Sequence, residues 1–222
     1  MTERKRREQQ LAVFNRVLRH NLRNRVDVIR SHAETLCDQA AAAGHAQRII
    51  DNADRLATLG TRVRDANRLL RREPRPRRLD LAETVQAVID DLTAEATDVT
   101  VRTMFPAEPT VRADEEAVRM IVESALTNAI EHATEVAEVR LDATDDGYTI
   151  EVHDDGPGIP VGELETLHAG TESMLRHSRG LGLWRIQWAT DLLNGRLSFD
   201  TDDGTTVAVT LPARPDDTAA GA

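Results

Sequence analysis

The chain has 222 residues, of which 40% are hydrophobic, a formal net charge of -10 and one cysteine, Cys37. This length allows one large or two small domains with a buried core, and a single cysteine excludes an internal disulfide. There is no run of about 18 apolar residues and no apolar signal region near the N-terminus. We therefore expect a soluble, cytoplasmic protein without a membrane segment.

Charge is distributed unevenly along the chain. Residues 1–78 hold 19 Lys and Arg against 9 Asp and Glu, whereas residues 79–222 hold 9 against 29. This step predicts a domain boundary near residue 79. The basic residues are spaced along predicted helices without interleaved aromatic residues, which argues against nucleic acid as a partner. Lys5 is the single lysine beside 27 arginines, and this acidic, arginine-rich composition suggests a halophilic source as a hypothesis.

Two amphipathic helices are predicted before residue 73. Residues 2 to about 42 contain no Gly or Pro, and their apolar residues recur at helical spacing: Leu11, Phe14, Leu18, Leu22, Val26, Ile29, Ala33 and Leu36. Gly44 suits the C-terminus of this helix. A second stripe follows before Pro74: Ile49, Ala53, Leu56, Val63, Ala66 and Leu70. One hairpin has little to bury its apolar faces against, so we expect two copies to pair as a four-helix bundle, which makes a homodimer.

Beyond a stiff linker at residues 73–78, short strands alternate with helices. Helices are expected at 82–94, 115–133 and 180–193, with Asp114 as an N-cap and Asn194-Gly195 as a helix end. Strands are expected at 79–81, 99–103, 110–112, 138–143, 148–153, 196–200 and 205–211. This order predicts an α+β sandwich across residues 79–213, with one mixed sheet covered by helices on one face. The tail, residues 214–222, is expected to be disordered.

The run VHDDGPGIP, residues 152–160, ends a predicted strand in a turn. Apolar and polar residues alternate up to Val152, so Asp154 stands at the strand end, where its side chain can face a pocket. Gly156 and Gly158 permit positive φ and a close approach of the backbone to a ligand. Taken alone, this sequence favours an ordinary hairpin turn over a ligand site.

Three further motifs accompany this run in a definite order. A predicted helix with Asn128 (ESALTNAIEHA) precedes it, SRGLGLW follows it, and Gly204-Thr205-Thr206 precedes the last strand. Their order and spacing resemble the N, G1, G2 and G3 boxes of the histidine-kinase ATP-binding domain, the fold shared with gyrase and heat-shock chaperone ATPases. In the first helix, RHNLRNRV resembles the H-box. The whole chain thus resembles the catalytic core of a sensor histidine kinase, including haloarchaeal members, with the helical hairpin at 1–72 and the ATP-binding domain at 79–213.

The resemblance implies a site for ATP and Mg²⁺. Asn128 would bind Mg²⁺ through its amide oxygen, a hard neutral ligand, and Asp154 would accept a hydrogen bond from the adenine amino group. Gly156 and Gly158 would let the backbone lie against the nucleotide. Gly180, Leu181 and Gly182 would bind the triphosphate at a helix N-terminus. Thr205 and Thr206 would lie near the adenine.

Several positions leave alternatives open. Arg176 or Arg179 could contact the γ-phosphate from a short lid, or be solvated loop arginines. Glu131 and His132 could line the phosphate side or lie on a solvated helix face. Ser124 stands where many histidine kinases have another Asn, and Ser178 replaces the first glycine of the usual triple.

The H-box resemblance implies that His20 accepts phosphate. Its neutral ring has a nucleophilic nitrogen near neutral pH, and Asn24, four residues later on the same helical face, would help to place water for dephosphorylation. Asn21 stands where most of the family has an acidic residue, so it can orient the ring but is a poor proton acceptor. Arg25 replaces the usual proline of the motif.

The implied activity is that of an autophosphorylating histidine kinase that passes phosphate from ATP to His20 and then to an Asp of a response-regulator receiver domain. One alternative is a catalytically weak nucleotide-binding dimeric scaffold, which would bind ATP without forming acid-labile phosphate on His20. Another is mainly a phosphatase of the response regulator, for which Asn24 would be important. A gyrase-like or chaperone-like ATPase is disfavoured, because Ser124 cannot activate water as the Glu of those enzymes does.

Overall fold

The computed structural model describes residues 26–33, 35, 42–94, 98–145, 147–159 and 182–212. These residues belong to two compact units. The first ends at residue 71, and the second comprises residues 72–159 and 182–212. Within these ranges, none of the helices has both the length and the apolar character needed to cross a membrane.

The first unit is helical where it is described. Residues 26–33 are helical, and α2, Ala42–Arg71, confirms the second predicted helix. The expected helix end at Gly44 is wrong, because Gly44 lies within the first turns of α2. Neighbouring alanines have the highest helix propensity and offset one glycine near a helix end. Several large apolar side chains of this unit are exposed in the single chain: Val26, Val28 and Ile50.

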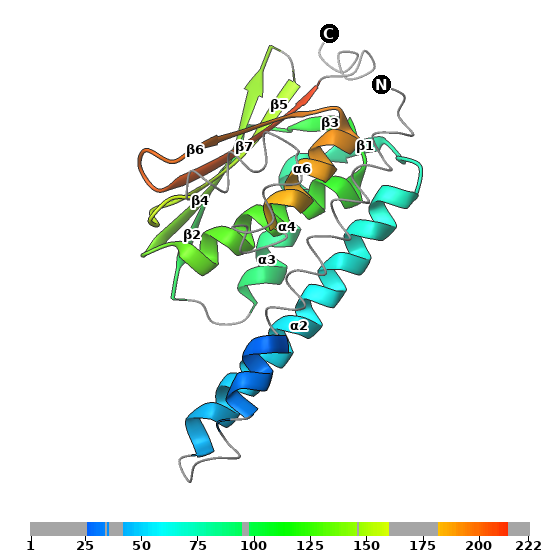
Figure 1. Ribbon diagram of the computed structural model, residues 1–222. Helices are drawn as coiled ribbons and strands as arrows, with labels where there is room; N and C mark the ends of the chain where they lie inside the picture. Colours follow the sequence, from blue (N-terminus) through cyan, green and yellow to red (C-terminus); the bar gives the residue numbers. More distant parts are fainter. Residues whose placement is uncertain are drawn as a thin grey trace. The chain divides into compact units, whose positions relative to one another are not determined.

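A five-stranded mixed sheet forms the framework of the second unit (Figure 1). Its strand order is β2-β4-β5-β7-β6, with β2 Thr100–Met104, β4 Val136–Thr144, β5 Gly147–Asp154, β7 Thr205–Pro212 and β6 Arg196–Asp200. β2 runs parallel to β4, and the other neighbouring strands are antiparallel. The predicted mixed sheet is therefore confirmed.

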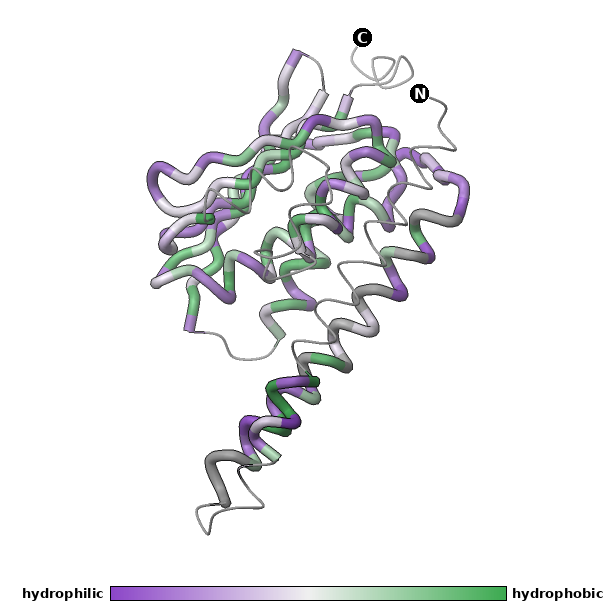
Figure 2. The backbone as a smooth tube through the Cα atoms, in the orientation of Figure 1, coloured by the Kyte–Doolittle hydropathy of each residue, from purple (hydrophilic) through white to green (hydrophobic). Residues whose placement is uncertain are grey.

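Helices α4 Glu115–His132 and α6 Gly182–Leu193 pack against one face of this sheet, and α3 Leu81–Thr93 packs against α4 (Figure 1). Alternate residues of the central strands are buried on that face, including Ile150, Val152, Val207 and Val209. The opposite face is more polar, and there Thr149 and Thr210 share a hydrogen bond of 3.1 Å across β5 and β7. Figure 2 shows hydrophobic residues recurring along the strands and along the helices that cover them.

Two short strands form a separate antiparallel sheet, which differs from the single sheet that we expected. These strands are β1 Arg77–Asp80 and β3 Thr110–Ala113. Each stops where a helix begins: the Asp80 carboxylate caps α3 by accepting from the Glu83 N–H at 3.0 Å, and Asp114 caps α4. β1 and β3 pair with each other along all four residues, and in the described part of the chain neither joins the five-stranded sheet.

Residues next to the helix ends determine where α4 begins and where α6 ends. The Asp114 carboxylate accepts from the Ala117 N–H at 3.3 Å, which confirms the predicted N-cap of α4. Asn194 has φ of 57°, and the Gly195 N–H donates to the Thr190 carbonyl at 2.9 Å. This left-handed ending is the one that Asn-Gly predicts, and it returns the chain to the sheet as β6.

Candidate functional site

Asp154 is a buried carboxylate at the end of β5, as the sequence predicted. It is 5% exposed, and it accepts hydrogen bonds from the Gly156 N–H at 2.9 Å and from the Thr205 side chain. Burial raises the pKa of Asp154, although these hydrogen bonds and the nearby His153 and His132 oppose the increase. An ionised carboxylate has about four acceptor sites, so Asp154 retains the capacity to accept from a ligand.

The turn after Asp154 packs against the turn before β7. Thr205 is the register partner of Asp154, and the preceding Gly204 has φ of +82°. A Cβ at Gly204 would overlap the Asp154 carbonyl, so this position requires glycine for both reasons. Gly158, with φ of +79°, faces the Gly204 carbonyl from the other turn. Residues that are 50 positions apart therefore form one side of the candidate site.

Asn128 and Gly182 form a second contact. Asn128 lies on α4 and Gly182 begins α6. A Cβ at Gly182 would lie 2.7 Å from the Asn128 Oδ1 and 2.9 Å from its Nδ2. The absence of a side chain at residue 182 thus leaves the space that the Asn128 amide occupies beside the start of α6.

The end of α4 connects these two pairs. A Cβ at Gly156 would overlap the carbonyl of His132, the last residue of α4. The adjacent Asp155 carboxylate accepts from backbone N–H groups just after α4, and these hydrogen bonds, first that from Glu135, lower the pKa of Asp155. Sequence reasoning gave Asp155 no role. The signal was a second carboxylate directly after the strand end.

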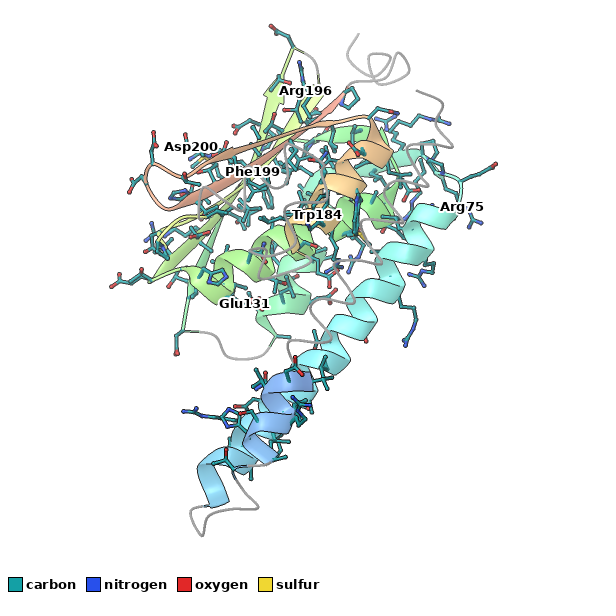
Figure 3. All side chains as sticks on the ribbon, in the orientation of Figure 1. Arg75, Glu131, Trp184, Arg196, Phe199 and Asp200 are labelled. Carbon is teal, nitrogen blue, oxygen red and sulfur yellow. The ribbon has the colours of Figure 1, made fainter. Side chains whose placement is uncertain are left out.

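A buried arginine joins α4 to α6, and the sequence analysis also missed it. Arg185 is 3% exposed, and its Nη2 donates to the Glu123 Oε2 at 3.0 Å. Trp184 and Trp188, on the same helix, lie with their rings tilted by 35° and their centroids 5.8 Å apart, and Figure 3 shows Trp184 on α6. One arginine within the apolar run LWRIQW was the available signal, because a buried charge requires a partner.

The residues around Asn128 offer neutral oxygen ligands. The Ser124 hydroxyl, one turn earlier on α4, is buried and has no hydrogen-bond partner within the described part of the chain. Amide and hydroxyl oxygens suit Mg²⁺, which usually keeps several waters and binds substrate phosphates. The described residues contain no group of three or more His, Cys, Asp or Glu that could hold a metal. Glu131 and His132 are exposed. This donor set fits Mg²⁺ that arrives with a phosphate ligand.

Other predicted site residues lie outside the described residues. They comprise the H-box group and the lid with the beginning of the G2 box: His20, Asn21, Asn24, Arg176, Arg179, Gly180 and Leu181. Within the described residues, Asn128 of the N box lies beside Gly182, the last glycine of the G2 box. Asp154 of the G1 box lies beside the turn that contains the G3 box, at Gly204 and Thr205.

Comparison with known proteins finds a matching family and similar chains. Residues 113–215 match the family described as histidine kinase-, DNA gyrase B-, and HSP90-like ATPase. The chain is 27% identical over 159 residues to the signal transduction histidine-protein kinase/phosphatase UhpB of Salmonella typhimurium, covering 68% of this chain and 29% of that protein. It is 32% identical over 152 residues to the non-motile and phage-resistance protein of Caulobacter vibrioides, covering 62% and 18%. The chain thus spans less than a third of the length of these curated relatives.

Solved structures share the fold. The Acinetobacter baumannii histidine kinase AdeS superposes with a TM-score of 0.65 at 13% identity, covering 88% of this chain and 98% of that one. The mycobacterial sensor histidine kinase MprB gives 0.53 at 24% identity, covering 64% and 99%. The ATP-binding domain of PrrB from Mycobacterium tuberculosis gives 0.53 at 20% identity, covering 63% and 98%. The second unit therefore has the mixed α/β fold of a histidine-kinase-type ATPase domain.

Proposed function

We propose that this chain is the catalytic part of a two-component histidine kinase that binds Mg-ATP and phosphorylates itself on His20. The observation that carries the proposal is the convergence on α4 of two pairs, the buried Asp154 with Thr205 and Asn128 with Gly182. This convergence occurs in a domain whose family and fold include histidine kinases. The chain covers only part of its curated relatives, so the proposal concerns this part alone.

The proposed organisation follows the sequence. Residues 1–72 are a dimerisation and phosphoacceptor hairpin, 73–78 a linker, 79–213 the ATP-binding domain and 214–222 a disordered tail. Exposure of Val26, Val28 and Ile50 in the single chain supports homodimerisation through the hairpin, because apolar helix faces are usually covered by a partner.

In the proposed complex, the two ends of ATP are held by different parts of the site. The Asp154 carboxylate accepts from the adenine amino group, which a guanine, with an acceptor oxygen at that position, cannot provide. Gly156 and Gly158 leave room for the nucleotide beside the backbone. The Asn128 amide oxygen holds Mg²⁺, which neutralises charge that develops on the phosphates. Gly180, Leu181 and Gly182 supply backbone N–H groups for the triphosphate.

The proposed reaction moves one phosphoryl group. The bond between the γ-phosphorus and the bridging oxygen breaks, a bond to a ring nitrogen of His20 forms, ADP leaves, and the ring releases a proton. Asn21 orients the ring. Arg179 stabilises the charge on the transferred group. The phosphoryl group then passes to an Asp carboxylate of a response-regulator receiver domain.

A second candidate function is dephosphorylation of the response regulator. Two observations favour it: one similar protein is named a kinase/phosphatase, and Asn24 stands four residues after His20. In this reading, the Asn24 amide positions water for attack on the phospho-aspartate. An Asn24→Ala variant whose phosphatase activity equals that of the wild type would exclude this role.

Incubation of the full chain with γ-labelled ATP and Mg²⁺ in high salt tests the kinase proposal. His20→Gln and Asn128→Ala are run in parallel, and each labelled sample is divided between acid and base. We expect acid-labile, base-stable label on the wild type alone, because phosphohistidine hydrolyses in acid. Transfer to candidate receiver domains then follows.

The possible outcomes separate the candidate functions. Label that persists in His20→Gln would contradict the acceptor assignment. ATP binding without any label would favour the catalytically weak scaffold or the phosphatase, and Asn21→Asp would then test whether a proton acceptor restores phosphorylation. Failure of the wild type to bind ATP would contradict the proposal as a whole.

A further inference from the structure

We propose that Asp155 is a positioning residue that sets the spacing between the adenine end and the metal end of the nucleotide site. This inference rests on the proposed function, since it assumes that Asp154 and Asn128 bind opposite ends of one nucleotide. Asp155 itself acts through the backbone around it.

The Asp155 carboxylate holds three consecutive backbone N–H groups directly after α4. Its Oδ1 accepts from Thr134 at 2.8 Å, from Glu135 at 3.1 Å and from Val136 at 3.2 Å. Its Oδ2 also accepts from Glu135 and Val136, at 3.2 and 3.3 Å. Successive N–H groups of this kind form an anion-binding concavity, and here the chain supplies the anion itself. The lowered pKa of Asp155 agrees with this arrangement.

Two reciprocal hydrogen bonds connect the same segments. The Thr134 hydroxyl donates to the Asp155 carbonyl at 3.2 Å, and the Asp155 N–H donates to the Val136 carbonyl at 3.3 Å. Gly156 approaches the His132 carbonyl so closely that a Cβ there would overlap it. The loop after β5 is therefore attached to the end of α4 through its backbone, the Asp155 carboxylate and this close contact.

This attachment lies between the two proposed binding residues. Asp154 directly precedes Asp155, whereas Asn128 lies four residues before His132, or about one turn of α4. A ligand that spans both residues requires their spacing to be held within a few tenths of an ångström. Because the Asp155 side chain is exposed, water can solvate the backbone N–H groups that it holds when the carboxylate is removed. Its expected effect is therefore on geometry more than on folding.

Nucleotide titration of purified variants of this chain tests this inference. Isothermal titration calorimetry with Mg-ATP and Mg-GTP gives the Kd values, and thermal unfolding reports stability in parallel. We expect Asp155→Ala to raise the Kd for Mg-ATP about tenfold. We also expect it to lower the ratio of the Kd for Mg-GTP to the Kd for Mg-ATP. Asp155→Asn retains one acceptor oxygen and should give an intermediate Kd. The matched control is Asp80→Ala, which removes a helix cap elsewhere in the same unit and should lower the Tm while the Kd changes by less than about twofold.

Thr134→Val provides a second variant that keeps the carboxylate and the shape of residue 134. It removes only the hydrogen bond from the Thr134 hydroxyl to the Asp155 carbonyl, so we expect a smaller increase in Kd. If Asp155→Ala does not fold, this variant tests the inference in its place. Wild-type affinity in the folded Asp155→Asn and Thr134→Val variants would overturn the inference while leaving the proposed function intact. A wild type that binds no Mg-ATP would overturn both.

Discussion

Arg72 and Asp114 form a bidentate ion pair, with 2.6 Å between Nη1 and Oδ2 and 2.5 Å between Nη2 and Oδ1. The Asp114 side chain is 3% exposed. The same carboxylate accepts from the Arg75 N–H at 2.7 Å and caps α4 through Ala117; Figure 3 labels Arg75 in this segment. One aspartate thus joins the segment that follows α2 to the beginning of the helix that carries Asn128.

Asp114→Ala should lower the free energy of unfolding by about 3 kcal/mol, because it leaves the Arg72 guanidinium without its buried partner and removes a helix cap. Urea unfolding measures this change. The control is Arg119→Ala, which breaks the exposed ion pair with Asp91 and should cost less than about 1 kcal/mol. Equal losses in the two variants would show that burial of the Asp114 pair adds no stability.

The pH dependence of Asp114 has a definite sign. Burial alone would raise its pKa, but the hydrogen bonds from Arg72, Arg75 and Ala117 hold the pKa below its ordinary value. Its stabilisation is therefore present above the unfolded pKa of about 3.9 and disappears as pH falls through the lower folded pKa. Urea unfolding at several pH values should show the deficit of Asp114→Asn shrinking with acidity. A constant deficit would contradict this linkage.

Asp154→Asn should weaken nucleotide binding and raise the stability of the fold at higher pH. The folded pKa of Asp154 is raised by burial, so its contribution is most favourable below the unfolded pKa and is lost as pH rises through the folded pKa. We expect the variant to gain stability relative to the wild type as pH increases across this window. The same variant should weaken Mg-ATP binding about tenfold to hundredfold, because the amide is a weaker acceptor and an imperfect partner for the adenine amino group. Unchanged affinity would exclude an adenine contact.

Gly182→Ala should displace the Asn128 amide, because the new Cβ would lie 2.7 Å from its Oδ1. We expect the affinity for Mg-ATP to fall at least about tenfold. The affinity for ATP should fall less when excess chelator removes Mg²⁺. Gly60→Ala is the matched control: Gly60 lies in α2 with no atom within 4 Å of an added Cβ. It should gain about 0.5–1 kcal/mol of stability and bind nucleotide normally. If the affinity for ATP depended on Mg²⁺ in the same way in Gly182→Ala and in the wild type, the effect of the Gly182–Asn128 contact on Mg²⁺ binding would be contradicted.

The charge distribution predicts stabilisation by salt. Residues 79–222 hold 29 Asp and Glu against 9 Lys and Arg, and their repulsion is screened at high ionic strength. The Tm should rise by at least about 5 °C between about 0.1 M and about 2 M KCl. Sucrose at matched osmolality controls for solute exclusion. A Tm that does not rise in KCl would exclude the halophilic hypothesis.

The sequence determined those features whose causes are local. The Asp114 cap, the Asn194-Gly195 helix end and the alternation of β5 and β7 each depend on residues within a few positions, so spacing alone predicted them. Through its resemblance to histidine-kinase ATP-binding domains, the order of the four motifs predicted that Asn128, Asp154, Gly182 and Thr205 belong to one nucleotide site. The contacts between these residues come from the structure.

Only the tertiary structure decided which side chains connect distant segments. Asp155 binds N–H groups about 20 positions earlier, Arg72 binds Asp114 42 positions later, and Arg185 binds Glu123 62 positions earlier. These charges carry no local periodicity, since each has its partner only after strand register and helix packing bring the segments together. The same holds for the small β1-β3 sheet, because its antiparallel pairs, from Asp80 with Thr110 to Arg77 with Ala113, join residues 30 to 36 positions apart.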